Sequence, residues 1–187
     1  MSVTTLDPKT ALIVIDLQKG LSAFQSVDPL HEVAEKAGVL ASAFRRHCLP
    51  VVLVNVAGVA PGRTEQGHGS MQFPPDFTEL LPELGQQPED HVVTKYTWGA
   101  FPGTGLESWL KAAGVTQIVL AGVATSIGVE STAREAYALG LNVTLALDAM
   151  TDLNAEAQAN SVARIFPRLG ETGTTQEIVA LLDKQPI

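Results

Sequence analysis

Five short runs of apolar, mostly β-branched residues constrain the fold of this chain more than any other feature. They cover residues 11–15, 50–56, 91–94, 117–123 and 142–147. The runs are nearly continuous in apolar residues instead of alternating with polar ones, as in strands whose two faces are both covered in a parallel sheet. The pattern therefore predicts a parallel sheet between layers of helices. Residues 170–173 are expected to add a sixth strand.

The intervals between these strands carry apolar residues at helical spacing. Helices are predicted over 29–47, 104–113, 128–139, 154–165 and 174–184. Because parallel strands need crossover connections, this alternation predicts an α/β fold. We expect a three-layer αβα arrangement, Rossmann-like, with a doubly wound and mostly parallel sheet of about six strands. No repeat or low-complexity linker divides the chain, which predicts one domain over residues 1–187.

Composition narrows the classes of partner. The net charge of −8 argues against nucleic acid or an anionic membrane as the main partner. The apolar runs are too short to span a bilayer, and the polar amino terminus does not read as a signal peptide. The single cysteine fits a reducing compartment. We therefore expect a soluble, cytoplasmic protein that acts on a small molecule, and the charged share of only 17% favours a homo-oligomer.

Charged residues follow two of the predicted strands. Asp16 comes directly after the first run and Lys95 after the third. Doubly wound folds bind their ligands at this end of the strands. Each charge is costly at a buried strand end unless it is paired, so we expect the two side chains to form an ion pair. Two interpretations of Asp16 stay open, a general acid or base and a simple cap of a helix or loop. Lys95 can likewise be the partner of Asp16 or a solvated end of its strand.

Two further features lie at the same strand ends. Tyr96, Trp98 and Phe101 bring three of the ten aromatic residues of the chain within six positions, which favours either a pocket wall or ordinary packing. Small residues dominate 122–128, where the fourth strand must turn into a helix. The start of that helix can offer backbone N–H groups to an anion or oxyanion, or its small residues can simply allow close packing.

These residues together resemble the isochorismatase-like hydrolase family. The likeness rests on IDLQKG, on TKYTWGAF and on GVATSIGVESTAREAYALG, and it extends to ALDAMTD and IFPRLGETGTTQEI, so that it covers nearly the whole chain. The family pattern is a triad of Asp, Lys and Cys, and Asp16 and Lys95 match its first two members. Gly128 stands at the cysteine position. Glycine has no side chain, so the thioester chemistry of the amidase members cannot run from this position.

The resemblance also implies roles for the site. Isochorismatases likewise carry glycine at the cysteine position and cleave a vinyl ether. By this likeness Asp16 is the general acid, and Lys95 holds it in place and attracts a small anionic substrate. A cis peptide bond is implied between Val123 and Ala124, with backbone N–H groups of Ala124 and Gly128 turned toward the pocket. The residues assigned to substrate binding are Phe24, Trp98, Phe101 and Ala124.

Several other residues are given no catalytic role. The metal-binding branch of the family has an Asp-x-His motif after the second strand, whereas this chain has only His68 there, so we predict neither a metal nor a cofactor. The roles of His68 and Arg63 stay open. Cys48 is interpreted as a small packing residue at the opposite end of the second strand from the site. Ser126 precedes the nucleophile position by two residues and is a poor substitute nucleophile.

Three functions compete at this point. The first is a hydrolase that acts on a small anionic substrate without a covalent intermediate. The second is a catalytically inactive relative that binds a small ligand or a protein partner. The third is a cysteine-independent amidase or lyase that uses Asp16 as a base toward water. The presence of both Asp16 and Lys95 favours an active enzyme, since a scaffold needs neither.

Overall fold

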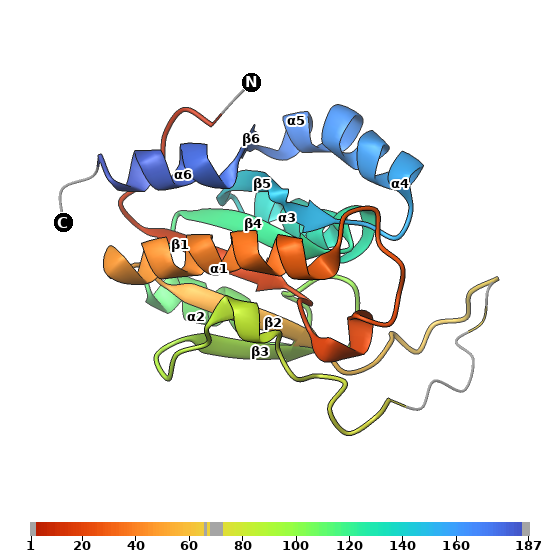
Figure 1. Cartoon of the computed structure of the whole chain (residues 1–187). Helices are drawn as coiled ribbons and strands as arrows, with labels where there is room; N and C mark the ends of the chain where they lie inside the picture. The colour runs from red at the N-terminus through yellow and green to blue at the C-terminus, as the bar shows by residue number, and fades with distance from the viewer. Residues whose placement is uncertain (1–2, 66, 68–72, 185–187) are drawn as a thin grey trace.

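A computed structural model describes residues 3–65, 67 and 73–184 of the chain. Its described residues form one parallel sheet of six strands in the order β3-β2-β1-β4-β5-β6 (Figure 1). The strands are β1 (Thr10–Ile15), β2 (Val51–Val56), β3 (His91–Lys95), β4 (Gln117–Val123), β5 (Asn142–Thr151) and β6 (Glu171–Gly173). The prediction of a doubly wound parallel sheet is confirmed, including the sixth strand.

Helices connect these strands. They are α1 (Leu30–Arg46), α2 (Leu106–Ala112), α3 (Glu130–Ala138), α4 (Ala155–Asn160), α5 (Phe166–Leu169) and α6 (Thr175–Leu182). Short 3₁₀ turns cover Lys19–Leu21 and Pro82–Leu84, and π-helical turns cover Thr125–Val129 and Ser161–Ile165. Within the described part of the chain, no helix is both long and apolar enough to cross a membrane.

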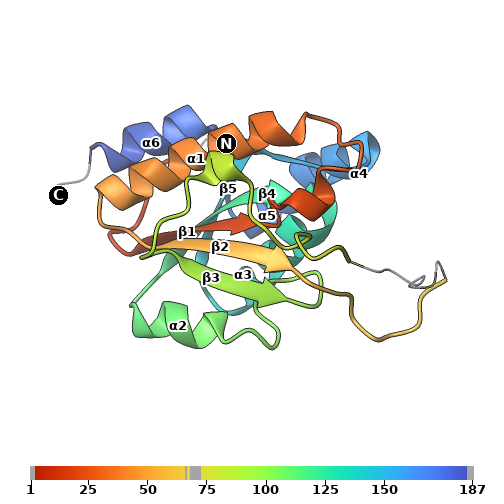
Figure 2. The same cartoon turned by 60° about the horizontal axis from the view of Figure 1, so that its bottom comes forward.

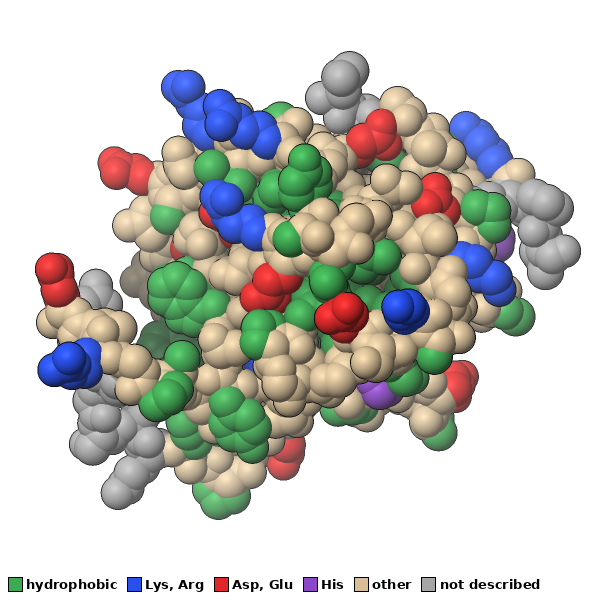
Figure 3. Space-filling view, turned by 180° about the vertical axis from the view of Figure 1, so that it is seen from behind, with side chains coloured by type: hydrophobic (Ala, Val, Ile, Leu, Met, Phe, Trp, Pro, Cys, Tyr) green, Lys and Arg blue, Asp and Glu red, His purple; other side chains and the backbone are tan. Residues whose placement is uncertain are grey.

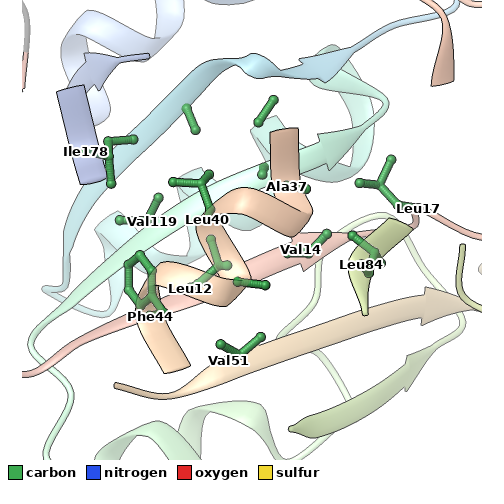
Figure 4. Close-up of a cluster of buried hydrophobic side chains, with 14 of the residues drawn as sticks. Leu12, Val14, Leu17, Ala37, Leu40, Phe44, Val51, Leu84, Val119 and Ile178 are labelled. Carbon is green, nitrogen blue, oxygen red and sulfur yellow. The ribbon is translucent and has the colours of Figure 1, made fainter. Parts of the chain in front are cut away.

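The helices cover both faces of the sheet. α1 and α6 pack on one face, and α2, α3 and α5 pack on the other (Figure 1, Figure 2). On the first face, Leu40 and Phe44 of α1 lie against Leu12 and Val119 of the central strands, and Ile178 of α6 closes the cluster (Figure 4). Seen from behind, apolar side chains lie between the charged ones on the molecular surface, in keeping with the low charged share (Figure 3).

Two elements differ from the sequence prediction. β5 continues to Thr151 instead of ending at residue 147, because its pairing with β4 shifts register: Leu120 pairs with Leu145, but Gly122 pairs with Met150. The helix predicted over 154–165 is interrupted by a π-helical turn and continues as α5. Both irregularities depend on pairing and packing with distant segments, which local periodicity does not report.

The strand order reverses between β1 and β4. From β1 the chain builds outward through β2 and β3, and it then crosses to β4 on the other side of β1. Ile15 pairs with Gly122 at this boundary. Gly122 has φ +123°, and a Cβ atom there would stand 2.0 Å from the Ile15 carbonyl oxygen, so only glycine allows the two strands to come this close. Such a switch point is where doubly wound folds bind ligands.

The interpretation of Cys48 as a packing residue is wrong. Its side chain is exposed, and its φ of 54° places it in the left-handed conformation that ends α1. The Cys48 N–H donates to the Arg45 carbonyl at 3.0 Å, and the Leu49 N–H donates to Phe44 at 2.9 Å. The chain reverses here and exposes the cysteine. Cys48 precedes the amino end of β2 and therefore lies away from the switch point.

Candidate active site

Asp16 and Lys95 meet at the carboxyl end of the sheet. Asp16 follows β1, whereas Lys95 ends β3, two strands away and thus about 10 Å across the sheet. The long lysine side chain spans this distance and places its Nζ 2.8 Å from Asp16 Oδ2. Both side chains are buried, with exposed fractions of 2% for Lys95 and 7% for Asp16. Lys95 Nζ also donates to the Thr97 carbonyl at 3.0 Å.

The environment of Asp16 favours proton transfer. Burial raises the pKa of its carboxyl from 3.8 to about 6, and the charge and hydrogen bond of Lys95 hold the pKa below what burial alone would give. Asp16 Oδ1 is also buried and has no hydrogen-bond partner among the described residues. A carboxyl with a pKa near neutrality and one unbonded oxygen can donate or accept a proton at physiological pH.

A cavity of about 220 Å³ opens beside this pair. Of the residues assigned to substrate binding from the sequence, Phe24, Trp98 and Ala124 line it. Its other described lining residues, apart from Asp16, Lys95 and Gly128, are Leu21, Ser26, Leu30, Val56, Gly58, Val59, Phe73, Phe77, Thr97, Val123, Ile127 and Leu153. The cavity is thus an apolar chamber with one buried ion pair in its wall.

Phe101 does not belong to the described lining of this cavity. Its side chain packs into the core on the α2 and α3 face of the sheet. The reason lies in α3, which holds the segment before it: the Phe101 N–H donates to Glu135 Oε2 at 3.3 Å, and the Ala100 N–H donates to Thr132 Oγ1 at 3.2 Å. These bonds direct Phe101 inward, while Trp98, on the same segment, stays at the cavity.

Gly128 lies next to the acid. A Cβ atom at this position would stand 3.3 Å from Asp16 Oδ2 and 3.0 Å from Ile15 Cγ2. Thr132 Oγ1, one turn later, donates to the Gly128 carbonyl at 2.7 Å and fixes the helical turn. The peptide bond between Val123 and Ala124 is cis. A side chain at position 128 would therefore lie beside Asp16, where glycine leaves space.

Asp152 is a residue near the site whose role the sequence did not reveal. One oxygen of its carboxylate accepts the Asn154 N–H at 3.0 Å, just before α4. Its other oxygen accepts the Ser126 N–H at 2.6 Å, at the start of the turn that leads into α3. Part of the anion-binding capacity of that helix start is thus already used by Asp152. Ser126 is not among the described lining residues.

Gln18 is a second residue whose role the sequence did not reveal. Its side chain is fully buried and spans two segments: Oε1 accepts the Val56 N–H at 2.7 Å, and Nε2 donates to the carbonyls of Val56 at 3.0 Å and Phe77 at 2.8 Å. Gln18 thereby ties the end of β2 to the segment that carries Phe77 in the cavity wall. A buried glutamine needs hydrogen-bond partners, but the sequence does not identify which residues they are.

The loop after β2 adds little to the site as described. His68 lies outside the described residues. Arg63 is exposed and does not occur in the described lining of the cavity. Within the described ranges, no three His, Cys, Asp or Glu side chains gather closely enough to hold a metal ion.

The fold and this site define an α/β enzyme with an acid–lysine pair at the switch point of its sheet. The family model described as the Isochorismatase domain matches residues 10–177. The chain belongs to the isochorismatase family, as the resemblance implied.

Individual relatives agree with this assignment. The chain is 42% identical to an uncharacterized isochorismatase family protein of Bacillus subtilis, YwoC, over 91% of this chain and 93% of the relative. An isochorismatase family protein of Burkholderia thailandensis has a solved structure that superposes with a TM-score of 0.93 at 40% identity, covering 98% of this chain and 100% of that one. Streptothricin hydrolase of Streptomyces noursei is 36% identical over 74% of this chain and 48% of its own length. The chain is therefore a hydrolase of this family whose substrate the likeness leaves open.

Proposed function

We propose that this protein hydrolyses a small molecule without a covalent enzyme intermediate and that Asp16 is its general acid. The observation that carries the proposal is the state of Asp16: a buried carboxyl whose pKa is about 6 and whose Oδ1 has no hydrogen-bond donor among the residues that the structure describes. The neighbouring Gly128 offers no nucleophile. A carboxyl that can give up and regain its proton near neutrality is suited to hydrolysis by water alone.

The reaction follows from this arrangement. Asp16 donates its proton to the substrate, either to a leaving group or to an unsaturated carbon, and generates an electrophilic centre. A water molecule adds its oxygen to that centre and returns one proton to Asp16. Lys95, bonded to Oδ2, orients the carboxyl and stabilises it while it is ionised. Atoms and charge balance over the cycle, and Asp16 ends protonated as it began.

A substrate screen tests the proposal. Wild-type protein and the Asp16→Asn variant are assayed in parallel against small esters, amides and enol ethers. Turnover of at least one compound class by wild type, absent in the variant, is the expected result. Specific binding without turnover in every class would instead support a ligand-binding relative that has lost activity, the alternative that the missing nucleophile suggests.

The pH profile separates the acid role from the base role. If Asp16 must be protonated, kcat/KM falls as the pH rises through about 6. If Asp16 acts as a base toward water, the same limb rises instead. We expect the falling limb, measured between pH 4.5 and pH 8.5 on any substrate from the screen. A rising limb centred near the same pH would assign the base role.

Activity is expected to be independent of thiols. Cys48 is the only cysteine of the chain and is placed away from the cavity, at the other end of β2. Alkylation with iodoacetamide and the Cys48→Ser substitution should each leave turnover within about twofold of wild type. Mass spectrometry confirms that the label is on Cys48. Loss of activity on labelling that Cys48→Ser prevents would refute the non-covalent mechanism.

A further inference from the structure

We propose that the substrate of this site is a compact, uncharged and mostly apolar molecule whose single polar group faces Asp16. This inference rests on the proposed function in one respect: it assumes that the cavity beside Asp16 is where the substrate binds. It replaces the expectation of an anionic substrate, which came from family likeness, with a class derived from the charges and walls of this cavity.

The charge of the cavity is the first argument. Among its described lining residues the only basic side chain is Lys95, and its Nζ is already bonded to Asp16 Oδ2 and to the Thr97 carbonyl. While Asp16 is ionised, as it is above its pKa of about 6, the two charges cancel. A substrate carboxylate in this buried wall would face the unpartnered Asp16 Oδ1 with no second cation to offset the repulsion.

The second argument is the start of the turn before α3. The exposed N–H groups of a helix start are the usual uncharged alternative for binding an anion. Here the Asp152 carboxylate, itself 1% exposed, accepts the Ser126 N–H at 2.6 Å. It contributes a negative charge one residue from Leu153 of the cavity wall. The Lys95 ammonium and the Ser126 N–H, each of which could attract an anion, are thus both already bonded to carboxylates of the chain.

The walls give the third argument. Four apolar side chains line the cavity and are about half exposed to solvent: Phe24 (51%), Val59 (44%), Trp98 (64%) and Leu153 (49%). An apolar ligand body would remove part of this surface from water, which is favourable. A charged or highly hydrated ligand would lose its own hydration against the same walls without compensation.

Size and polarity complete the description. The cavity volume of about 220 Å³ is below the ~300–1,000 Å³ of sites for drug-sized ligands, whereas an apolar cavity of ~150 Å³ already holds benzene. A single ring with one short substituent therefore fits. The substituent should both donate and accept hydrogen bonds, as an amide does, because Asp16 Oδ1 can accept while the carboxyl is ionised and can donate once the carboxyl is protonated.

Matched pairs of ligands test the proposal by binding alone. Benzamide and benzoate, phenylacetamide and phenylacetate, and cyclohexanecarboxamide and cyclohexanecarboxylate differ in charge and donor but hardly in shape. At pH 8, binding to wild type is measured by ligand-observed NMR with titration. Each amide is expected to bind at least about tenfold more tightly than its acid. The proposal is overturned by acids that bind as tightly as their amides, or by no amide binding up to about 10 mM.

Two variants identify the source of the preference. Asp152→Asn removes a negative charge beside the cavity and keeps one of the two oxygens that accept the Ser126 and Asn154 N–H groups. The ratio of amide affinity to acid affinity should therefore fall about threefold or more. Asp183→Asn removes the same charge beside His47, at the far end of α1, and should leave the preference unchanged. Equal preferences in both variants would overturn the electrostatic explanation. These measurements record binding and not turnover. If only the hydrolase proposal fails, the amides bind but no substrate is cleaved; if the substrate class proposed here fails, the amides do not bind more tightly than the acids.

Discussion

Replacing Asp16 with asparagine is expected to lower kcat by about 10²–10⁴-fold, the usual contribution of a general acid. Asparagine has nearly the same shape, and its side-chain oxygen can still accept a hydrogen bond from Lys95, which lies 2.8 Å from Asp16 Oδ2. It has no proton to transfer near neutral pH. The variant therefore keeps the cavity and loses the proton donor, so the loss should appear in kcat more than in KM.

The comparison needs a control for charge and a control for folding. Asp183→Asn removes an exposed carboxylate far from the cavity and should retain wild-type kcat. Far-UV circular dichroism and the melting transition show whether Asp16→Asn is folded. A folded Asp16→Asn protein with kcat within about threefold of wild type would remove Asp16 from the proton-transfer step. The falling pH limb near 6 should also disappear in this variant.

The parallel sheet could be predicted from the sequence because each strand is recognisable from its own residues. A strand such as 117–123 is continuous in apolar residues whatever it pairs with, and that continuity is typical of a strand buried on both faces. The Asp16–Lys95 pair was accessible for a related reason. Burying either charge without a partner of opposite sign costs free energy, and both charges stand at the same edge of the sheet. This cost predicts that the two side chains form an ion pair.

Other features depend on partners that are distant in the sequence. Phe101 and Trp98 are both aromatic and three positions apart, and it is hydrogen bonds from the backbone at 100 and 101 to Thr132 and Glu135 of α3 that direct Phe101 into the core. Asp152 bonds across 26 residues to Ser126, and Gln18 bonds across 38 residues to Val56. Residue type predicts that such groups need partners, but the sequence does not say which ones.

Replacing Lys95 with methionine is expected to lower the free energy of unfolding by about 3–5 kcal/mol at pH 8, as when one member of a buried ion pair is removed. Methionine keeps much of the apolar stem but supplies no charge. Asp16 is then an unpaired carboxylate in a buried site, because the interactions that held its pKa down are gone. Its pKa should rise above the wild-type value of about 6.

Two control proteins test whether the loss of stability in Lys95→Met comes from the buried charge. Lys19→Met removes an exposed lysine that pairs with Glu79 at the surface, and it should change stability far less. The double variant Asp16→Asn with Lys95→Met removes both charges and should be more stable at pH 8 than Lys95→Met alone, since no unpaired buried charge is left. A double variant no more stable than Lys95→Met would show that lost packing, not charge, causes the destabilisation.

The pH dependence of Lys95→Met distinguishes charge from packing within a single protein. In the unfolded chain Asp16 titrates near 3.8, whereas in the folded variant it titrates above 6. Between these values the folded state binds more protons than the unfolded state, so stability must fall as the pH rises through this window and recover on acidification. Urea unfolding at pH 8 and pH 5 should therefore show a smaller deficit relative to wild type at pH 5. A packing defect would give the same deficit at both pH values, because methionine does not titrate.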